Sequence, residues 1–372
     1  MNPKIEDIVI TRHRLPVEVP FHSSWDPRPL TALEATIVRV VADNGEVGIG
    51  SGDAMIGFER FKDVFIGEDP FDFERHNRAL DSISLFASRC WPLDMALWDL
   101  KGKTEGLPVF KLLGGQQSRV PVYGSTGTVR PAEQLAEQAL MLRESGFAAM
   151  KFRIGRRPPG EDARALRLVR MAIGDDIEIM VDANQAWRMP WDASMWWTFD
   201  DARAAIEEIV ELNIYWVEEP LHRGDFDGLK RLREIERFPR IASGEMNTEY
   251  YELRHLMNYG CVDVLQTDCA YFGGITGLSK IAREAADAGV MFNPHAWGNG
   301  IGFLANAHLV AGTGLPPYLE YSYDPPEWDV PVRDFMLADP VQYDGRGHVL
   351  LGDRPGLGFE LDEDMLERTR IV

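Results

Sequence analysis

The chain has 372 residues, and its 45% hydrophobic and 10% aromatic content is enough to bury a large core and a second, smaller domain. Its 59 acidic and 39 basic residues give a formal net charge of -20, which repels nucleic-acid phosphates and anionic lipid headgroups, so we expect neither nucleic acid nor a membrane as a partner. The three cysteines lack the spacing of a disulfide framework or a zinc site, and no secretory leader is recognisable, so we expect a cytoplasmic protein.

Residues 1–118 read as strands followed by helices without alternation, which is typical of an α+β domain. Apolar patterning predicts three strands, over residues 5–15, 31–42 and 47–50. A turn at Asn44 and Gly45 separates the last two. The strongest helical segment covers residues 94–115, where an apolar stripe closed by two glycines predicts one docking helix.

Residues 119–335 show short apolar runs separated by helix-length amphipathic stretches, the pattern of β/α units around a parallel sheet. The eight runs cover residues 120–125, 148–153, 177–182, 214–218, 240–245, 263–268, 290–295 and 318–322. Eight such strands favour a closed barrel. A doubly wound open sheet is the alternative, but no G-x-G-x-x-G follows the first run, and polar residues end nearly every run. Residues 336–372 are loop-like and are expected to return to the N-terminal domain.

Polar residues near the carboxyl ends of these runs would face one mouth of a barrel, where barrel enzymes keep their catalytic groups. They are Lys151, Arg153, Asp182, Asn184, Glu218, Glu219, Glu245, Asn247, Asp268, His295 and Glu320. Asp182, Glu218 and Glu245 end three successive runs and predict a metal site, because converging carboxylates need a cation between them. Oxygen ligands favour Mg²⁺, with Mn²⁺ as a substitute. Solvated acids at strand ends are the alternative, and alternation lets only one of Glu218 and Glu219 point inward.

Four further residues complete a candidate catalytic set, and a fifth is ambiguous. Lys151 and Arg153 are two apart on one strand and share a face, so they can place two cations beside an anionic substrate, with ordinary surface charge as the alternative. His295 and Asp268 end neighbouring runs, and a carboxylate bonded to one ring nitrogen would orient the ring and raise the basicity of the other. Glu320 is either a hydrogen-bonding partner of the substrate or a structural carboxylate.

The ordered motifs K-x-R, VDAN, VEEP, SGE, Q-x-D, PHAWGNG and LEY, together with ALWDLKGK and LLGG, resemble the mandelate racemase subgroup of the enolase superfamily, especially its acid-sugar dehydratases. The likeness spans nearly the whole chain. It implies an α/β fold, a (β/α)7β TIM-like barrel with an α+β capping domain built from the N-terminal region and the C-terminal tail. It also implies Mg²⁺ at the three carboxylates, a His295–Asp268 dyad, and Glu320 near the substrate carboxylate or enolate. We expect further substrate contacts from Asn184, Asn247, Trp297, His22 and Trp25.

Three departures from the subgroup pattern bear on specificity. Arg153 stands where the subgroup usually has a second lysine that serves as a base, and an arginine stays protonated. The capping loop GIGSGD lacks the expected glutamate. Residues 188–200 look like an insertion, and its three tryptophans are too apolar for a loop fully in water. We expect them to be covered, either by packing on the outer helices or as a lid or subunit contact at the mouth.

These features predict Mg²⁺-dependent dehydration of a sugar acid, an aldonate or an aldarate, to a 2-keto-3-deoxy acid through an enediolate, with His295 as the base. A racemase, epimerase or lactone cycloisomerase using the same enediolate is the alternative. A barrel that keeps the metal site only for binding is a third possibility, against which the oriented histidine argues. We expect the chain to form a homo-oligomer and to act on a small anionic substrate.

Overall fold

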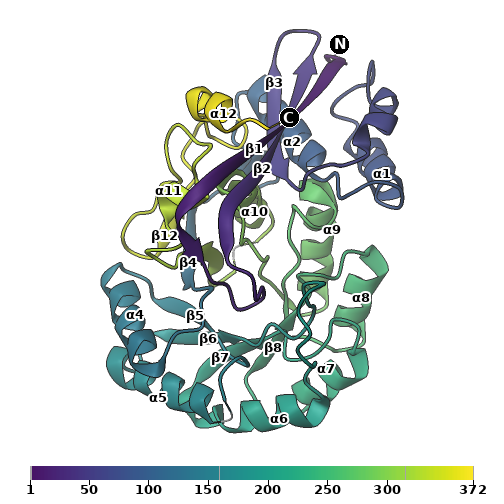
Figure 1. Cartoon of the computed structure of the whole chain (residues 1–372). Coiled ribbons are helices and arrows are strands. Elements are labelled where there is room, and N and C mark those ends of the chain that lie inside the picture. The colour runs from purple at the N-terminus through teal and green to yellow at the C-terminus, as the bar shows by residue number, and fades with distance from the viewer. Residues whose placement is uncertain (1, 159, 315, 372) are drawn as a thin grey trace.

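The computed structural model describes residues 2–158, 160–314 and 316–371. Figure 1 shows an antiparallel sheet and its helices, which form the capping domain, above a barrel ringed by helices. Both chain ends lie on the capping side. In the part of the chain described, no helix is both long and apolar enough to cross a membrane.

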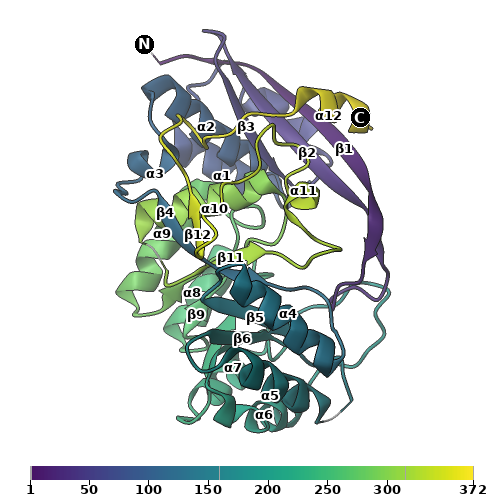
Figure 2. The same ribbon diagram turned by 90° about the vertical axis from the view of Figure 1, so that its left-hand side faces the viewer.

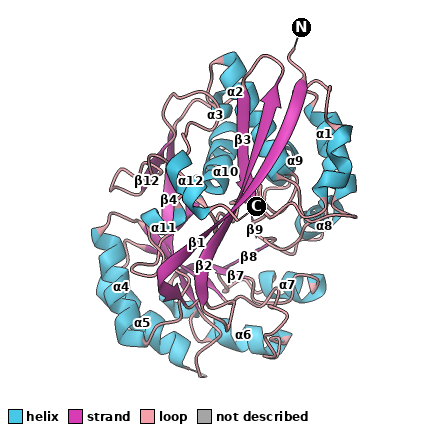
Figure 3. Ribbon diagram, turned by 45° about the horizontal axis from the view of Figure 1, so that its top comes forward, coloured by secondary structure: helices cyan, strands magenta, loops and turns pink. Residues whose placement is uncertain are grey.

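The capping sheet has three antiparallel strands, β1 (Ile5–Phe21), β2 (Leu30–Ala42) and β3 (Val47–Gly52), with β2 in the middle. They run beyond the predicted ranges. β1 continues past residue 15 because its pairing with β2 resumes after a register shift, with Phe21 opposite Leu30. The connection between β1 and β2, residues 22–29, therefore lies at the lower end of the sheet, next to the barrel (Figures 1 and 3).

Helix α2 (Pro92–Glu105) packs against β3 at very short range, and two glycines make this possible. A Cβ on Gly48 would lie 2.0 Å from the carbonyl oxygen of Ala96, and one on Gly50 would lie 2.0 Å from that of Pro92. Any larger side chain would push the helix off the sheet. These two glycines of β3 thus fix the position of α2 against the capping sheet.

The predicted single helix over 94–115 is wrong. α2 ends at Gly106, whose φ of 67° lies in the left-handed region, and α3 (Val109–Leu112) starts after Pro108. Glycine ends a helix readily in this conformation, and proline lacks the N–H that continuation would need. The rest of the capping domain's helical part consists of η1 (Phe58–Val64) and α1 (Phe73–Ile83).

The barrel is built from eight parallel strands, as predicted. They are β4 (Arg119–Ser125), β5 (Ala149–Arg153), β6 (Glu178–Asp182), β7 (Ile214–Glu218), β8 (Arg240–Ser243), β9 (Val264–Leu265), β10 (Met291–Phe292) and β11 (Leu319–Ser322). Their helices are α4 (Ala132–Glu144), α5 (Glu161–Ile173), α6 (Phe199–Glu207), α7 (Phe226–Arg233), α8 (Tyr250–Asn258), α9 (Gly274–Asp287) and α10 (Gly300–Thr313), with the short η2 (Val210–Leu212) after α6. Seven β/α units and a final strand confirm the expected (β/α)7β architecture.

The last strand returns to the first. β11 pairs in parallel with β4, from Leu319 opposite Val122 to Ser322 opposite Ser125. Hydrogen-bonded pairing within the described ranges runs from β10 through β4 to β11, and no ladder joins β10 to β11.

The C-terminal tail contacts both parts of the molecule (Figure 2). After the short α11 (Val330–Arg333), β12 (His348–Leu350) pairs antiparallel with the start of β4. α12 (Glu363–Thr369) then lies against β1, where the N–H of Ile371 donates to the carbonyl of Arg12 at 2.8 Å. The tail therefore ties the capping sheet to the barrel, as the sequence motifs implied.

Candidate active site at the barrel mouth

An apolar layer fills the barrel beneath the mouth, with one side chain from each of six strands. It consists of Tyr123, Ala149, Met180, Trp216, Ala242 and Val264, and Met291 and Tyr318 pack at its edge. Because side chains alternate along a strand, the residue two positions further faces the same interior, one layer nearer the mouth. This step places a polar layer of Ser125, Lys151, Asp182, Glu218, Gln266, Asn293 and Glu320 on the apolar one. A second step of two reaches Arg153, Asn184, Asp268 and His295.

Lys151 is fully buried and joins carboxylates of two other strands. Its Nζ lies 2.6 Å from Glu218 Oε1 and 2.8 Å from Glu320 Oε1, which also accepts a hydrogen bond from Ser125 at 2.8 Å. Burial lowers the pKa of Lys151, but the charges of Glu218 and Glu320 outweigh burial and raise it overall. Burial likewise raises the pKa of Glu320, but Lys151 and His295 outweigh it, so that the pKa falls. The two neighbouring carboxylates therefore favour the charged form of Lys151.

Arg153 is the second buried cation of the K-x-R motif. Its guanidinium pairs with Asp182, and its Nε donates to the carbonyl of Thr126 at 2.6 Å. Trp25 of the capping domain and Trp297 of the barrel place their rings 5.0 and 5.4 Å from the guanidinium carbon, within cation–π range. Burial lowers the pKa of Arg153, but Asp182 outweighs burial and raises it above its usual range. Arg153 cannot accept a proton from a substrate.

His295 is held by Asp268. Its Nδ1 lies 2.9 Å from Asp268 Oδ2, while Asp268 Oδ1 accepts from Asn306 Nδ2 at 2.9 Å. A carboxylate only accepts, so Nδ1 carries a proton in both the neutral and the charged ring, and Nε2 lies 3.7 Å from Glu245 Oε2 and 3.9 Å from Glu320 Oε2. Burial lowers the pKa of His295, but these three carboxylates outweigh it and raise it to about 9. The two residues of the predicted dyad are therefore in contact.

The three predicted metal ligands, Asp182, Glu218 and Glu245, are all buried at the mouth. Burial raises the pKa of Glu218 to about 7 and also raises that of Glu245, and the charge of Asp182 adds to both shifts. Across the described ranges, no group of three acidic, histidine or cysteine side chains is arranged closely enough to bind a metal ion as it stands. Instead, Glu218 forms an ion pair with Lys151, and Asp182 forms one with Arg153. The chemistry of the donor set, anionic and purely oxygen, fits Mg²⁺.

Glu219 breaks the alternation that the sequence argument assumed. β7 ends at Glu218, and Glu219 has a φ of 47°, so both side chains are buried on the barrel side. Neither carboxylate oxygen of Glu219 has a hydrogen-bond partner among the residues described, and its pKa is raised, first by burial and then by the charges of Glu245 and Asp182. An orphaned buried carboxylate is costly unless a cation or proton joins it. This is a second observation that fits a cation at the mouth.

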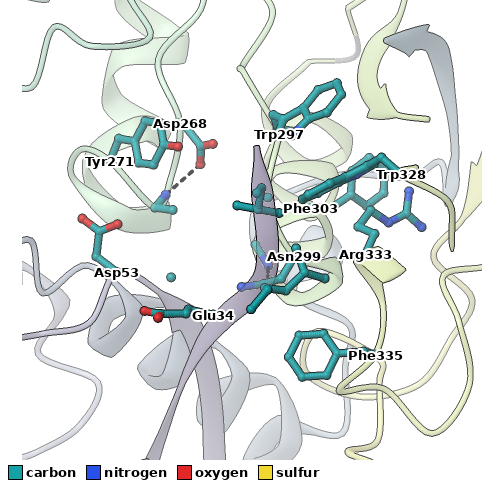
Figure 4. Close-up of a pocket in the computed structure, with 18 of the residues that line it drawn as sticks. Glu34, Asp53, Asp268, Tyr271, Trp297, Asn299, Phe303, Trp328, Arg333 and Phe335 are labelled. Atoms are coloured by element: carbon teal, nitrogen blue, oxygen red, sulfur yellow. Dashed lines mark hydrogen bonds between the residues drawn. The ribbon is translucent and has the colours of Figure 1, made fainter. Parts of the chain in front are cut away.

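Two cavities open at the mouth and share the rings of Tyr271 and Trp297. The smaller, about 80 Å³, is lined by Arg153, Glu245 and His295 among others. The larger, about 620 Å³ and shown in Figure 4, extends between the capping strand β2 and helix α10. Tyr271 stacks on the ring of His295 with centroids 5.4 Å apart, so it forms part of the wall between catalytic groups and the larger cavity.

The five predicted substrate contacts fall into two groups. Asn184, Trp25 and Trp297 line the smaller cavity, and Asn184 Nδ2 donates to Asp182 Oδ2 at 3.0 Å. Asn247 and His22 line neither cavity. Asn247 is buried with its Nδ2 3.3 Å from the carbonyl of Arg223, and His22 is exposed.

Two of the three tryptophans of the 188–200 insertion follow the two predicted arrangements, whereas Trp196, also expected to be covered, stays 37% exposed. Trp197 packs on the barrel, where it would meet a Cβ added at Gly155 at 2.9 Å. Trp191 lines the larger cavity and reaches the capping domain, with its Nε1 donating to Asp26 at 2.7 Å and the Arg28 guanidinium 4.2 Å from its ring. Trp191 stays 41% exposed, so its cover in the single chain is incomplete.

The sequence reasoning missed several polar residues of the mouth. Gln266 Nε2 donates to Glu218 Oε2 at 2.8 Å, Ser125 donates to Glu320, and the buried Asn293 has no partner for its amide among the residues that the structure covers. Each follows an inward apolar residue by two positions. Counting in twos from the apolar layer would have found them. Ser24, which donates to Asn184 from the capping loop, had no such signal.

Comparison with known proteins agrees with this geometry. The L-talarate/galactarate dehydratase of Salmonella typhimurium is 31% identical, with 93% of this chain and 85% of that protein covered. The D-galactarolactone cycloisomerase of Agrobacterium fabrum is also 31% identical, with 97% of each chain covered. A crystal structure of an L-talarate/galactarate dehydratase mutant liganded with Mg and L-glucarate superposes with a TM-score of 0.84 at 28% identity, covering 100% of this chain and 93% of that one. A racemase and an epimerase occur among the relatives at 25% and 30% identity.

Two family matches span most of the sequence. Residues 5–114 match the mandelate racemase / muconate lactonizing enzyme N-terminal domain, and residues 134–365 match the enolase C-terminal domain-like family. The buried cations, the carboxylates and the oriented histidine lie in the second of these regions. The chain belongs to the mandelate racemase subgroup of the enolase superfamily of enzymes.

Proposed function

We propose that this protein is a Mg²⁺-dependent acid-sugar dehydratase that converts an aldonate or aldarate to a 2-keto-3-deoxy acid. The observation that carries the proposal is the asymmetry of the smaller cavity. Among its lining residues, His295 is oriented by Asp268 for proton exchange, whereas Arg153 is a buried cation that cannot exchange protons. A one-base site suits elimination, whereas racemisation needs a proton donor or acceptor on both faces of the carbon.

The chemical obstacle is the weak acidity of a proton next to a carboxylate. Its pKa lies roughly twenty units above that of a side-chain base, a gap on the order of 27 kcal/mol at about 1.36 kcal/mol per unit. Lys151 and Arg153 supply fixed, buried positive charge where negative charge develops on the substrate. Mg²⁺ held by Asp182, Glu218 and Glu245 would add a Lewis acid beside the substrate carboxylate.

The proton transfers assigned to His295 balance without a second base. Its Nε2, which faces the mouth, takes the C2 proton, and the electron pair is stored as an enediolate. The C3–O bond then breaks, the leaving hydroxyl takes the proton back from His295, and water departs. The resulting enol tautomerises to the 2-keto-3-deoxy acid.

A cycloisomerase is the second candidate. The Agrobacterium relative carries that name at 31% identity over 97% of both chains, and opening a lactone by elimination also needs only one base. Arg153 therefore argues against racemisation, but it does not distinguish dehydration from lactone opening. Mn²⁺ as a substitute metal, the homo-oligomer and the cytoplasmic location stay predictions.

The test is a screen of aldonates, aldarates and their lactones with Mg²⁺ in deuterated water, followed by proton NMR. We expect a keto-deoxy product from at least one acid, no C2 epimer of the substrate, and no product with His295→Asn. Recovery of C2-inverted substrate at a rate matching dehydration would reveal a competent base on the Arg153 side. Binding without any exchange of the C2 proton would leave a non-catalytic barrel.

A further inference from the structure

The larger cavity is where most of a sugar acid has to lie. The smaller cavity measures about 80 Å³ and the larger one about 620 Å³. A six-carbon acid whose C1 and C2 sit beside Arg153 and His295 must extend past the shared rings of Tyr271 and Trp297. The composition of the 620 Å³ cavity therefore selects the distal end of the substrate.

The charges that line this cavity are almost all negative. Glu34 and Asp53 of the capping domain and Asp268 of the barrel contribute carboxylates to the lining, and all three are labelled in Figure 4. Arg333 is the single cationic residue of the lining. It is 1% exposed, donates from Nε and Nη2 to both oxygens of Asp334, and points away from Glu34 in Figure 4. Two of its nitrogens therefore pair with one carboxylate, and its Nη1 has no hydrogen-bond partner among the described residues.

Two other arginines approach the cavity but do not line it. Arg89 forms an ion pair with Asp53 and lies over the ring of Tyr271 at 4.4 Å. Arg28 lies over Trp191 at 4.2 Å. The one side-chain amide of the lining, Asn299, is also engaged, since its Oδ1 caps α10 and its Nδ2 donates to Ser51 at 2.9 Å. A carboxylate entering here would meet Glu34, which forms no ion pair among the described residues, whereas Arg333 and Arg89 already pair with carboxylates and Arg28 lies outside the lining.

Aromatic rings form the rest of the wall. Trp191, Trp297, Trp328, Phe303 and Phe335 all line the cavity. Such rings can pack against the C–H groups of a sugar chain. They offer few hydrogen bonds to a carboxylate, and removing a carboxylate from water onto a largely apolar wall is costly.

We infer that the substrate carries one carboxylate, at its reacting end, and an uncharged distal end: an aldonate rather than an aldarate. This rests on the proposed sugar-acid dehydration and narrows its substrate class. The comparison does not decide the point, because a relative at 31% identity is named for the dicarboxylate galactarate and another at 31% for the monocarboxylate arabinonate.

The test compares matched pairs of equal length and configuration, D-gluconate with D-glucarate, D-galactonate with galactarate, and D-mannonate with D-mannarate. With Mg²⁺ present, we expect kcat/KM for the best aldonate to exceed that for its aldarate by about tenfold or more, as like-charge juxtaposition requires. Glu34→Lys should shift the ratio toward the aldarate by a similar factor. Glu46→Lys, the same charge change at the exposed turn outside the cavity, should leave the ratio unchanged.

The outcomes separate this inference from the proposed function. An aldarate turned over as well as or better than its aldonate would overturn the inference and leave dehydration standing. Equal shifts from Glu34→Lys and Glu46→Lys would also overturn it, because the selectivity would then come from overall charge. If no acid of either class gives a product or exchanges its C2 proton, the proposed function fails and the inference fails with it. Mg²⁺-dependent shifts in Tm with each acid give a second readout that does not need turnover.

Discussion

Two buried histidines, one at the barrel mouth and one at the seam between α3 and α10, have opposite pKa shifts. His295 at the mouth faces carboxylates, which outweigh burial and raise its pKa to about 9. His308 at the seam is buried among apolar groups, and burial lowers its pKa to about 4. There the N–H of Phe110 donates to Nδ1 at 3.1 Å, and Nε2 lies 3.2 Å from the carbonyl of Leu357, so the neutral ring satisfies both partners.

The difference shows how this fold separates chemistry from stability. At the seam the two hydrogen-bond partners of the ring are backbone groups, and the neutral ring satisfies both. The mouth instead concentrates charge that burial opposes, so its groups are ready to receive an ion or a substrate. Changes at the mouth should therefore mainly alter activity, whereas changes at the seam should mainly alter stability. The predictions below test that division.

The largest effect is expected from the carboxylates. Asp182→Asn and Glu245→Gln should each weaken Mg²⁺ binding severely and abolish turnover, because each removes an anionic oxygen ligand from the proposed site. Calorimetric titration with Mg²⁺ and a product assay measure both. The exposed Glu211→Gln, on a helix away from the mouth, is the control. Unchanged Mg²⁺ affinity in both site variants would remove the metal site.

His295→Asn should lower kcat by about 10² to 10⁴-fold, the usual contribution of a general acid–base group, with Mg²⁺ affinity retained. The exposed His22→Asn tests the other predicted histidine and should change kcat little, since the ring lines neither cavity. Steady-state kinetics on the best substrate decides. A larger loss with His22→Asn than with His295→Asn would reverse the assignment.

One change at the mouth should affect stability strongly, which marks the limit of the division. Lys151→Met leaves the buried Glu218 and Glu320 without their shared cation, and losing one partner of a buried ion pair costs about 3 to 5 kcal/mol. Lys280→Met, which removes an exposed pair with Glu74, should cost less than about 1 kcal/mol. Urea unfolding of both variants measures the free energies. Equal losses would mean that the mouth network contributes nothing beyond surface pairing.

At the seam, the pKa of His308 predicts acid sensitivity. The folded pKa lies below the ordinary value of 6.5, so the stabilisation is complete above pH 6.5 and is lost as the pH falls toward 4. The shift corresponds to about 3 kcal/mol. Urea unfolding between pH 7 and 4 should show a steeper loss for the wild type than for His308→Gln, which has no proton to bind. Parallel profiles would show that the ring is not held neutral.

The smallest effect concerns the insertion. Trp191→Ala should raise KM several-fold with kcat and Tm little changed, because the ring lines the larger cavity and is already 41% exposed. Met195→Ala in the same segment, 84% exposed, is the control. If the two variants behave alike, Trp191 does not shape the cavity.

The barrel and most charged residues of its mouth could be predicted from the sequence, because side chains alternate along a strand with a period of two residues. Lys151 and Arg153, for instance, follow the inward Ala149 by two and four positions, and their order could be read directly. The same rule misjudged Glu219, since the strand ends just before it and its backbone turns to a positive φ.

Contacts between the capping domain and the barrel could not be predicted from the periodicity of the sequence. Ser24 reaches Asn184 over 160 positions of sequence, and the charge of the larger cavity depends on which capping residues meet the barrel. The break in the helix at Gly106 was readable in principle, because a glycine followed two positions later by a proline is a stop signal that the apolar stripe obscured.

The placement of β4 sets the order in which the molecule can be completed during synthesis. This strand is the first of the barrel to leave the ribosome, yet it is flanked by β11 and β12, which are made near the end. Of the two carboxylates that Lys151 joins, Glu320 is made 169 positions later (320 − 151). A nascent chain can form its capping hairpin early, but the barrel closes around β4 only after residues 319–350 have emerged.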